Sequence, residues 1–221
     1  MKLSINALIK FLIGLLLVGL LIFLPAGTLA YPGGLLFLCL LFIPMLLMGI
    51  VMLARARDLL AKRLDAKEKQ AAQKGVQSLA GLVFMAGFVL AGLDFRFGWS
   101  DMPLPAVIAA SVIFLIGYGL YAEVMRENAY LSRTVKMEEG QTVISTGLYG
   151  IVRHPMYLAS VLMFLSIPLV MGSWYALIPF AFYPVLMVVR ILDEEKLLSA
   201  ELSGYEAYKR KVKYRMIPFI W

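Results

Sequence analysis

The chain has 221 residues, of which 62% are hydrophobic and 16% are charged, and its formal net charge at pH 7 is +7. A soluble domain has about half apolar and a quarter charged residues, so this composition excludes an ordinary soluble protein and indicates an integral membrane protein. The basic residues lie between apolar runs and not along one face, which favours membrane lipids over nucleic acid as their partners.

Six apolar segments follow one another, at residues 11–30, 33–54, 77–93, 104–122, 156–171 and 174–192. The first two reach the length of about twenty residues that crosses a bilayer, whereas the third and the last two are shorter. We therefore predict an all-α fold, a polytopic membrane helical bundle of about six spans. The last two segments are predicted to form a hairpin that turns at Gly172-Ser173 and is kinked by its prolines, Pro168, Pro179 and Pro184.

The charges between the segments predict how the bundle is oriented. The connection 55–76 is rich in Lys and Arg, whereas the connection 31–32 carries no charge. By the positive-inside rule the basic connection is cytoplasmic, and an N-in, C-in arrangement follows. We predict that 55–76 forms an amphipathic interfacial helix or a solvated helical connection. The same arrangement brings residues 123–155 and 190–221 together on the cytoplasmic face.

The one histidine of the chain, His154, stands beside Arg153 and directly before Pro155, where the fifth apolar segment begins. Proline suits the first turn of a helix, so His154 is predicted at the N-cap. Helix N-termini attract anions, and with Arg153 this end could bind a carboxylate or a phosphate. The alternative is that Arg153 binds a lipid head group and His154 is an interfacial packing residue.

An acidic cluster, Asp193-Glu194-Glu195, closes the last apolar segment. An ion pair between Arg190 and Glu194, four residues apart on a helix, would account for one of these acids. It does not account for three acids in a row at a membrane exit, where an unpaired buried carboxylate is costly. Because carboxylates accept hydrogen bonds from vicinal hydroxyl and ammonium groups, the cluster is a second candidate site.

Several kinds of site are excluded by the residues present. One histidine rules out an HExxH zinc site and one cysteine rules out a CxxC cluster. We expect no metal, with a site made of carboxylates alone as the alternative. The sequence also lacks a Walker loop and a GxGxxG turn, so a nucleotide-like cofactor would be bound in some other way. The basic and aromatic C-terminal tail is predicted to form an amphipathic helix at the membrane surface.

Together these motifs resemble a known family. They comprise Gln141 to Tyr149, Arg153-His154-Pro155-Met-Tyr157, Arg190, Glu194-Glu195, Tyr205-x-x-Tyr208 and Arg215-Met-Ile-Pro218. In this order, residues 126–221 resemble the isoprenylcysteine carboxyl methyltransferases and their relatives, the membrane phospholipid N-methyltransferases. The resemblance divides the chain into N-terminal transmembrane spans with their basic connection, 1–122, and a methyltransferase-like catalytic region with a helical hairpin and an amphipathic tail, 123–221.

The resemblance implies an enzyme that uses S-adenosylmethionine to methylate a lipophilic acceptor, most simply a carboxylate, which enters from the bilayer. Its active site would face the cytoplasm, in a bacterial or archaeal plasma membrane. It implies a cofactor site made of Tyr149, Arg153, His154, Tyr157, Arg190, Glu194 and Glu195. The arginine with which the family orients its acceptor is not plainly matched. Residues at the end of the fourth span are candidates for that role, with a plain boundary cluster as the alternative: Arg126, Glu127 and Asn128.

Two other functions stay open at this point. The ending 213–221 is also similar to that of membrane sterol reductases, which bind NADPH and transfer hydride. A non-enzymatic, lipid-binding membrane protein is the third possibility. Cofactor binding separates the three, whereas neither the acceptor nor the oligomeric state can be inferred from the residues.

Overall fold

The computed structural model of the chain describes residues 2–64, 71–128, 130 and 140–221, and this part contains helices and no strand. The α-helices are α1 (Lys2–Ala26), α2 (Pro32–Arg55), α3 (Arg57–Leu64), α4 (Ala71–Phe97), α5 (Leu104–Glu127), α6 (Pro155–Val170), α7 (Leu177–Phe180), α8 (Tyr183–Glu201) and α9 (Tyr205–Lys211). A short 3₁₀ helix, Gly147–Gly150, precedes α6. The predicted all-α class is confirmed.

Four of the helices, α1, α2, α4 and α5, are long and apolar enough to cross a membrane. Large apolar side chains such as Leu16 and Leu24 of α1 are mostly exposed, as expected for a surface that faces lipid. The prediction that the third segment is short was wrong, because α4 has 27 residues. Its first turns are polar and so lie outside the apolar run, yet Gln73 there is buried and donates a 2.5 Å hydrogen bond to Asp193 of α8.

The last two predicted segments form shorter helices. The fifth becomes α6, which has 16 residues and contains Pro168. The chain turns at Gly172, with a φ of 78°, which confirms the predicted hairpin turn. The sixth divides into α7 and α8: Pro179 lies in the four-residue α7 and Pro184 lies in the first turn of α8. Since proline lacks an amide hydrogen, these residues interrupt the helix where a kink was predicted.

The connection 55–76 is helical at both of its ends. It contributes the end of α2, all of α3 and the first turns of α4. Residues 65–70 lie outside the described part, so the prediction of an interfacial or solvated helix extends beyond what the structure describes.

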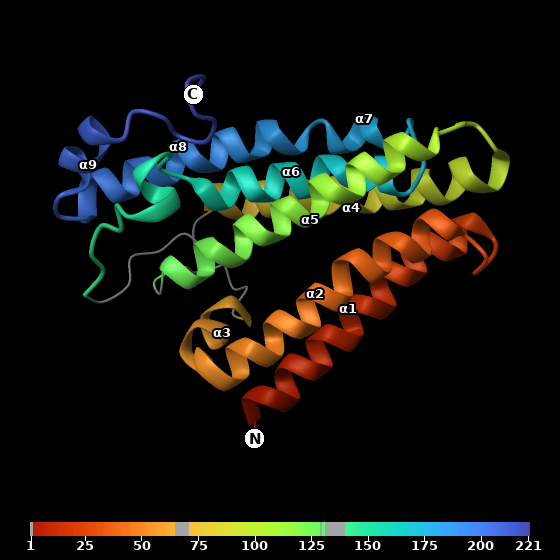
Figure 1. Cartoon of the computed structure of the whole chain (residues 1–221), viewed down its shortest axis with the longest axis horizontal. Helices are drawn as coiled ribbons and strands as arrows, with labels where there is room; N and C mark the ends of the chain where they lie inside the picture. The colour runs from red at the N-terminus through yellow and green to blue at the C-terminus, as the bar shows by residue number, and fades with distance from the viewer. Residues whose placement is uncertain (1, 65–70, 129, 131–139) are drawn as a thin grey trace.

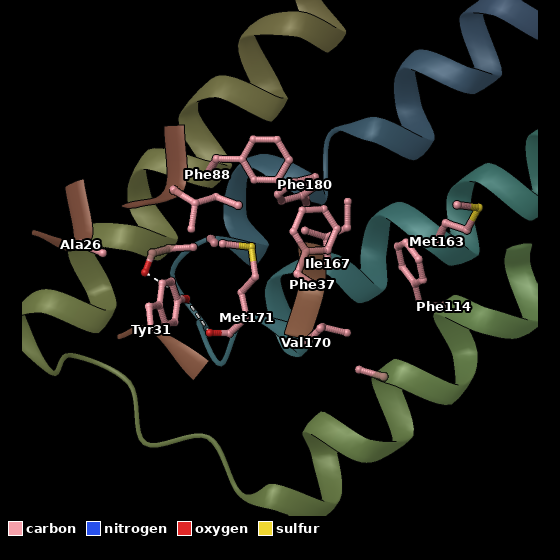
Figure 2. Close-up of a cluster of buried hydrophobic side chains, with 14 of the residues drawn as sticks. Ala26, Tyr31, Phe37, Phe88, Phe114, Met163, Ile167, Val170, Met171 and Phe180 are labelled. Carbon is pink, nitrogen blue, oxygen red and sulfur yellow. Dashed lines mark hydrogen bonds between the residues drawn. The ribbon is translucent and has the colours of Figure 1, made fainter. Parts of the chain in front are cut away.

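At one end of the bundle an aromatic core joins the N-terminal helices to the rest (Figure 2). Tyr31, between α1 and α2, is buried, and its hydroxyl donates a 2.5 Å hydrogen bond to the carbonyl of Met171 after α6. Phe37, Phe88 and Phe180 lie in the same buried cluster. Van der Waals packing of these large rings helps to hold α2, α4 and α7 together.

The same end is closed by a buried carboxylate. Asp94 of α4 accepts hydrogen bonds from the amide and the hydroxyl of Ser100, at 2.7 and 2.6 Å, and from the hydroxyl of Ser173. Ser173 follows α6, so one side chain joins the α4–α5 connection to the turn of the hairpin. A buried carboxylate is stable there because several donors satisfy it.

At the opposite end, α9, the C-terminal end of α8 and the segment that leads into α6 lie close together, with α3 below them (Figure 1). The lengthwise packing of α5 along α6 brings the end of α5 to this place. The two segments that the sequence predicted to share one face, at His154 and at Glu194-Glu195, therefore do share it.

Candidate functional site

A partly open cavity lies at this end of the bundle. Its wall comes from the end of α5, the segment 141–144, the 3₁₀ helix, the start of α6, the end of α8 and α9. Of the residues proposed from the sequence, six line it: Asn128, Tyr149, Arg153, His154, Tyr157 and Glu194. The other four proposed residues do not line the cavity: Arg126, Glu127, Arg190 and Glu195.

Glu195 is the centre of a buried charge cluster. Its Oε1 accepts a hydrogen bond of 2.6 Å from Nε of Arg153 and lies 3.3 Å from Nε2 of His154. Its other oxygen accepts a 2.8 Å bond from Nε of Arg215. Since both oxygens are engaged in this way, Glu195 joins α8, the start of α6 and the C-terminal tail.

This cluster determines the charge state of Glu195. Burial alone would raise the pKa of its carboxyl group. The hydrogen bonds from His154, Arg153 and Arg215 outweigh burial and hold the pKa well below its usual range. The carboxylate therefore stays ionised at neutral pH, and the cluster keeps its compensating charge.

His154 is the N-cap residue of α6, as predicted, and Pro155 follows it in the first turn. The backbone at this point pairs with the tail: the amide of Arg153 donates to the carbonyl of Tyr214 at 2.9 Å, and the amide of His154 donates to that of Arg215 at 2.7 Å. The guanidinium of Arg153 also donates to the carbonyl of Val212 at 2.7 Å. Arg153 thus donates hydrogen bonds to other groups of the protein, although it lines the cavity.

Tyr157 connects two charged residues of α8. Its hydroxyl donates a 2.5 Å hydrogen bond to Glu194 and accepts one of 3.0 Å from Nε of Arg190. Glu194 and Tyr157 line the cavity, whereas Arg190 lies behind them and is buried. Arg190 therefore contributes by orienting the tyrosine hydroxyl.

The three candidates at the end of α5 have different surroundings in the structure. Asn128 reaches the cavity and donates to the hydroxyl of Tyr149 at 2.9 Å. Glu127 accepts a 3.1 Å bond from the amide of Leu148 and so supports the 3₁₀ helix. Arg126 is largely exposed and forms a 2.6 Å ion pair with Glu123, which agrees with the boundary-cluster alternative.

Helix α9 covers the cavity and contributes residues that the sequence analysis assigned to the membrane surface. Tyr208 donates a 2.7 Å hydrogen bond to the carbonyl of Tyr149. Tyr205 is 3% exposed and lines the cavity, and its hydroxyl has no hydrogen-bond partner among the described residues. The Tyr205-x-x-Tyr208 repeat was the signal that could have placed both rings here, because it belongs to the motifs that carry the family resemblance.

Comparison with known proteins gives two kinds of match. Residues 105–203 match the phospholipid methyltransferase family, which confirms the resemblance and covers much of the cavity wall. The chain is also similar to Delta(14)-sterol reductases: it is 23% identical to one from Arabidopsis thaliana over 134 residues, which are 55% of this chain and 36% of that protein.

A second Delta(14)-sterol reductase, from Mus musculus, is 31% identical over 91 residues, which are 40% of this chain and 22% of the mouse protein. A third, from Methylotuvimicrobium alcaliphilum, is 22% identical over 136 residues, 55% of this chain and 32% of that protein. The chain thus spans between about a fifth and about a third of the length of these relatives. The matches support a membrane enzyme of the methyltransferase or of the sterol reductase type.

Proposed function

We propose, from the phospholipid methyltransferase domain in residues 105–203, that this integral membrane protein is an S-adenosylmethionine-dependent methyltransferase. Its acceptor is a lipophilic molecule that enters from the bilayer, with a carboxylate as the methylated group. The cofactor is bound in the cavity between the end of α8 and α9.

The observation that carries this proposal is that Glu194 and Tyr205 both line the cavity. Glu194 supplies a carboxylate that is oriented by Tyr157, and Tyr205 supplies a buried hydroxyl with no partner among the described residues. A buried polar group without a partner costs about 1–3 kcal/mol, so a ligand that satisfies it gains affinity. The ribose hydroxyls and the ammonium group of S-adenosylmethionine are partners of the kind that these residues require.

When bound, S-adenosylmethionine supplies a methyl group on a positively charged sulfur, which a carboxylate acceptor can take up without a general base. The residues of the chain bind and orient. Glu194 and Tyr205 would hold the polar part of the cofactor, and Asn128, on the α5 side, would contact the acceptor. Leu198 and Leu202 contribute apolar side chains to the cavity wall.

A reductase that uses NADPH is the second candidate, because the relatives compared above are named sterol reductases. NADPH carries several phosphate charges and needs free cationic groups. In the described part of the cavity wall Arg153 already binds Glu195, and Glu194 adds a negative charge. The negative charge of Glu194 in the cavity wall supports the positively charged S-adenosylmethionine over the negatively charged NADPH.

Calorimetric titration of the detergent-purified protein with S-adenosylhomocysteine, with NADPH as the comparator, tests the proposal. We expect saturable binding of S-adenosylhomocysteine that weakens about tenfold or more in Glu194→Gln, because a charge-assisted hydrogen bond is lost. Glu201→Gln is the matched control, since Glu201 is an exposed acid on the same helix. Binding of NADPH alone would favour the reductase, and binding of neither ligand by folded protein would exclude both enzymes.

A further inference from the structure

Residues 216–221, which we call the tail tip, form a closed turn after α9. The amides of Met216 and Ile217 donate to the backbone oxygen of Trp221 at 3.0 and 3.1 Å. In return, the amide of Trp221 donates to the carbonyl of Ile217 at 3.1 Å. Figure 1 shows the chain running back from α9 along α8 to this turn. The tail tip is therefore a compact, hydrogen-bonded part of the fold.

The tail tip packs against the last apolar turns of α8. Met216 is buried in one cluster with Met187 and Ile191 of that helix. Trp221 packs against the same cluster. Both α8 residues precede the acids at 193–195, which close the apolar segment. The tail tip therefore lies level with apolar turns of α8, on the membrane side of those acids.

Two large apolar side chains of the tail tip are exposed. Phe219 is 86% exposed and Ile220 is 77% exposed, more than the 70% of Leu24 on the lipid-facing side of α1. Phe219 also has a φ of 65°, which bulky residues rarely adopt. Such a conformation persists where other contacts compensate for it, and the contact of this ring with Tyr214 leaves most of it uncovered. An apolar partner outside the described chain would cover both side chains.

At the same level, α8 itself carries exposed apolar residues. Val189 and Leu192 are 49% and 41% exposed, and they lie on the turns that also carry Met187 and Ile191. In a membrane protein, exposed apolar side chains on such a helix contact acyl chains. The tail tip thus presents Phe219 and Ile220 at a depth where α8 already contacts lipid.

Exposed cations stand directly before the tail tip. Lys211 ends α9 and Lys213 follows it, and neither forms an ion pair with a described residue. Apolar residues next to such cations are the combination that binds an anionic membrane surface. Helix α9 does not itself offer an apolar face to lipid, because its Tyr205 and Tyr208 line the cavity.

We infer that the tail tip is a membrane anchor. Phe219 and Ile220 insert among the acyl chains of the leaflet at the cavity end of the bundle. Lys211 and Lys213 contact anionic head groups of the same leaflet. The segment between α9 and the tail tip is bonded to the start of α6, so the anchor also holds one wall of the cavity in place. This inference does not depend on which cofactor the cavity binds.

Spin-label accessibility in phosphatidylcholine nanodiscs tests the insertion. The single cysteine is removed as Cys39→Ala, and a nitroxide is attached to one new cysteine at a time. Ile220→Cys probes the tail tip, Val189→Cys the lipid-facing side of α8, and Ala207→Cys the exposed side of α9. Oxygen concentrates in hydrocarbon, whereas nickel ethylenediaminediacetate stays in water. We expect oxygen to relax the labels of Ile220→Cys and Val189→Cys more strongly, and the nickel complex to relax that of Ala207→Cys more strongly.

Two results would overturn the insertion. If the nickel complex relaxes the label of Ile220→Cys as strongly as that of Ala207→Cys, the tail tip lies in water. If neither agent reaches the label, the tail tip is covered by protein, such as a second copy of the chain. Phe219→Ser shows whether the label alone drives insertion: it should shift the label of Ile220→Cys toward the nickel complex. Leu29→Ser, at an exposed leucine between α1 and α2, is the control and should not shift it.

The head-group contact is tested with the same label in nanodiscs that also contain phosphatidylglycerol. We expect the oxygen preference of the Ile220→Cys label to rise with the anionic lipid, because Lys211 and Lys213 draw the tail tip toward it. The rise should be lost when both lysines are replaced by glutamine. Lys2→Gln, at an exposed lysine of α1, should keep it. An equal oxygen preference in both kinds of nanodisc would overturn the head-group contact.

Discussion

The hydroxyl of Tyr157 in α6 donates a 2.5 Å hydrogen bond to the carboxylate of Glu194 in α8. The next residue, Glu195, points away from the cavity to Arg153 and Arg215. Adjacent residues of a helix differ by about 100° in direction, so two neighbouring acids can face different surroundings. One acid of the pair is therefore available to a ligand, and the other holds the tail in place.

Tyr157→Phe tests the first of these roles. The change removes the donor to Glu194 and the acceptor for Arg190 while keeping the ring. Because Glu194 loses its orientation, we expect S-adenosylhomocysteine to bind about tenfold more weakly, with a loss of stability of about 1–3 kcal/mol. Calorimetry and thermal unfolding in detergent measure the two effects. Tyr175→Phe, at an exposed tyrosine, is the control, and equal affinities in the two variants would contradict the assigned role.

Glu195→Gln tests the second role. The substitution leaves Arg153 and Arg215 without their carboxylate, and breaking a buried ion pair in this way costs about 3–5 kcal/mol. We expect a clearly lower unfolding temperature at pH 7 and a tail that proteases cleave more readily. A cleavage pattern identical to that of the unchanged protein would show that Glu195 does not hold the tail.

The pH dependence of this effect has a definite sign. The pKa of Glu195 is lower in the folded protein than its ordinary value of 4.5. Its stabilising contribution is therefore complete above pH 4.5 and is lost as pH falls through the folded-state pKa. The stability difference between the unchanged protein and Glu195→Gln should shrink below about pH 4. Unfolding curves at a series of pH values measure it, and a constant difference down to pH 3 would contradict the assignment.

Much of this site could be predicted from local rules. Pro155 marks a helix start, so the N-cap position of His154 followed directly. The positive-inside rule placed His154 and Glu195 on one face, and they lie 3.3 Å apart. These inferences succeeded because they depend on short sequence distances and on the order of the apolar segments.

The rest depends on tertiary packing. Residues 71–76 are too polar to extend an apolar run, and Gln73 is accommodated in α4 because Asp193 of a distant helix accepts its hydrogen bond. In the sequence, Arg63 is one of several basic residues of the connection 55–76. In the structure, its Nη1 lies 3.8 Å from the sulfur of Met156. In both cases the partner lies about a hundred residues away, where periodicity and spacing carry no signal.

The turn before α6 gives a further test. Gly147 has a φ of 48°, and a Cβ at this position would overlap the carboxylate of Glu127. We expect Gly147→Ala to destabilise the protein by more than the 1–2 kcal/mol or so of a strained backbone alone, because Glu127 must also give up its bond to Leu148. Gly204→Ala is the control, since Gly204 has a φ of 84° but its nearest contact would be 4.0 Å away. Equal unfolding temperatures for both variants would contradict this account.

The buried carboxylate at the far end should affect stability without affecting the cavity. Asp94→Ala leaves three donors of Ser100 and Ser173 unsatisfied, so we expect a loss of about 3 kcal/mol or more. Asp94→Asn keeps one acceptor and should lose less, and Asp101→Ala, at an exposed acid, should lose little. Since Asp94 lies at the opposite end from Glu194, titration of the folded Asp94→Asn protein should give the unchanged S-adenosylhomocysteine affinity. A lower affinity would mean that the two ends are coupled through α6 and α8, and the cavity would then depend on the whole bundle.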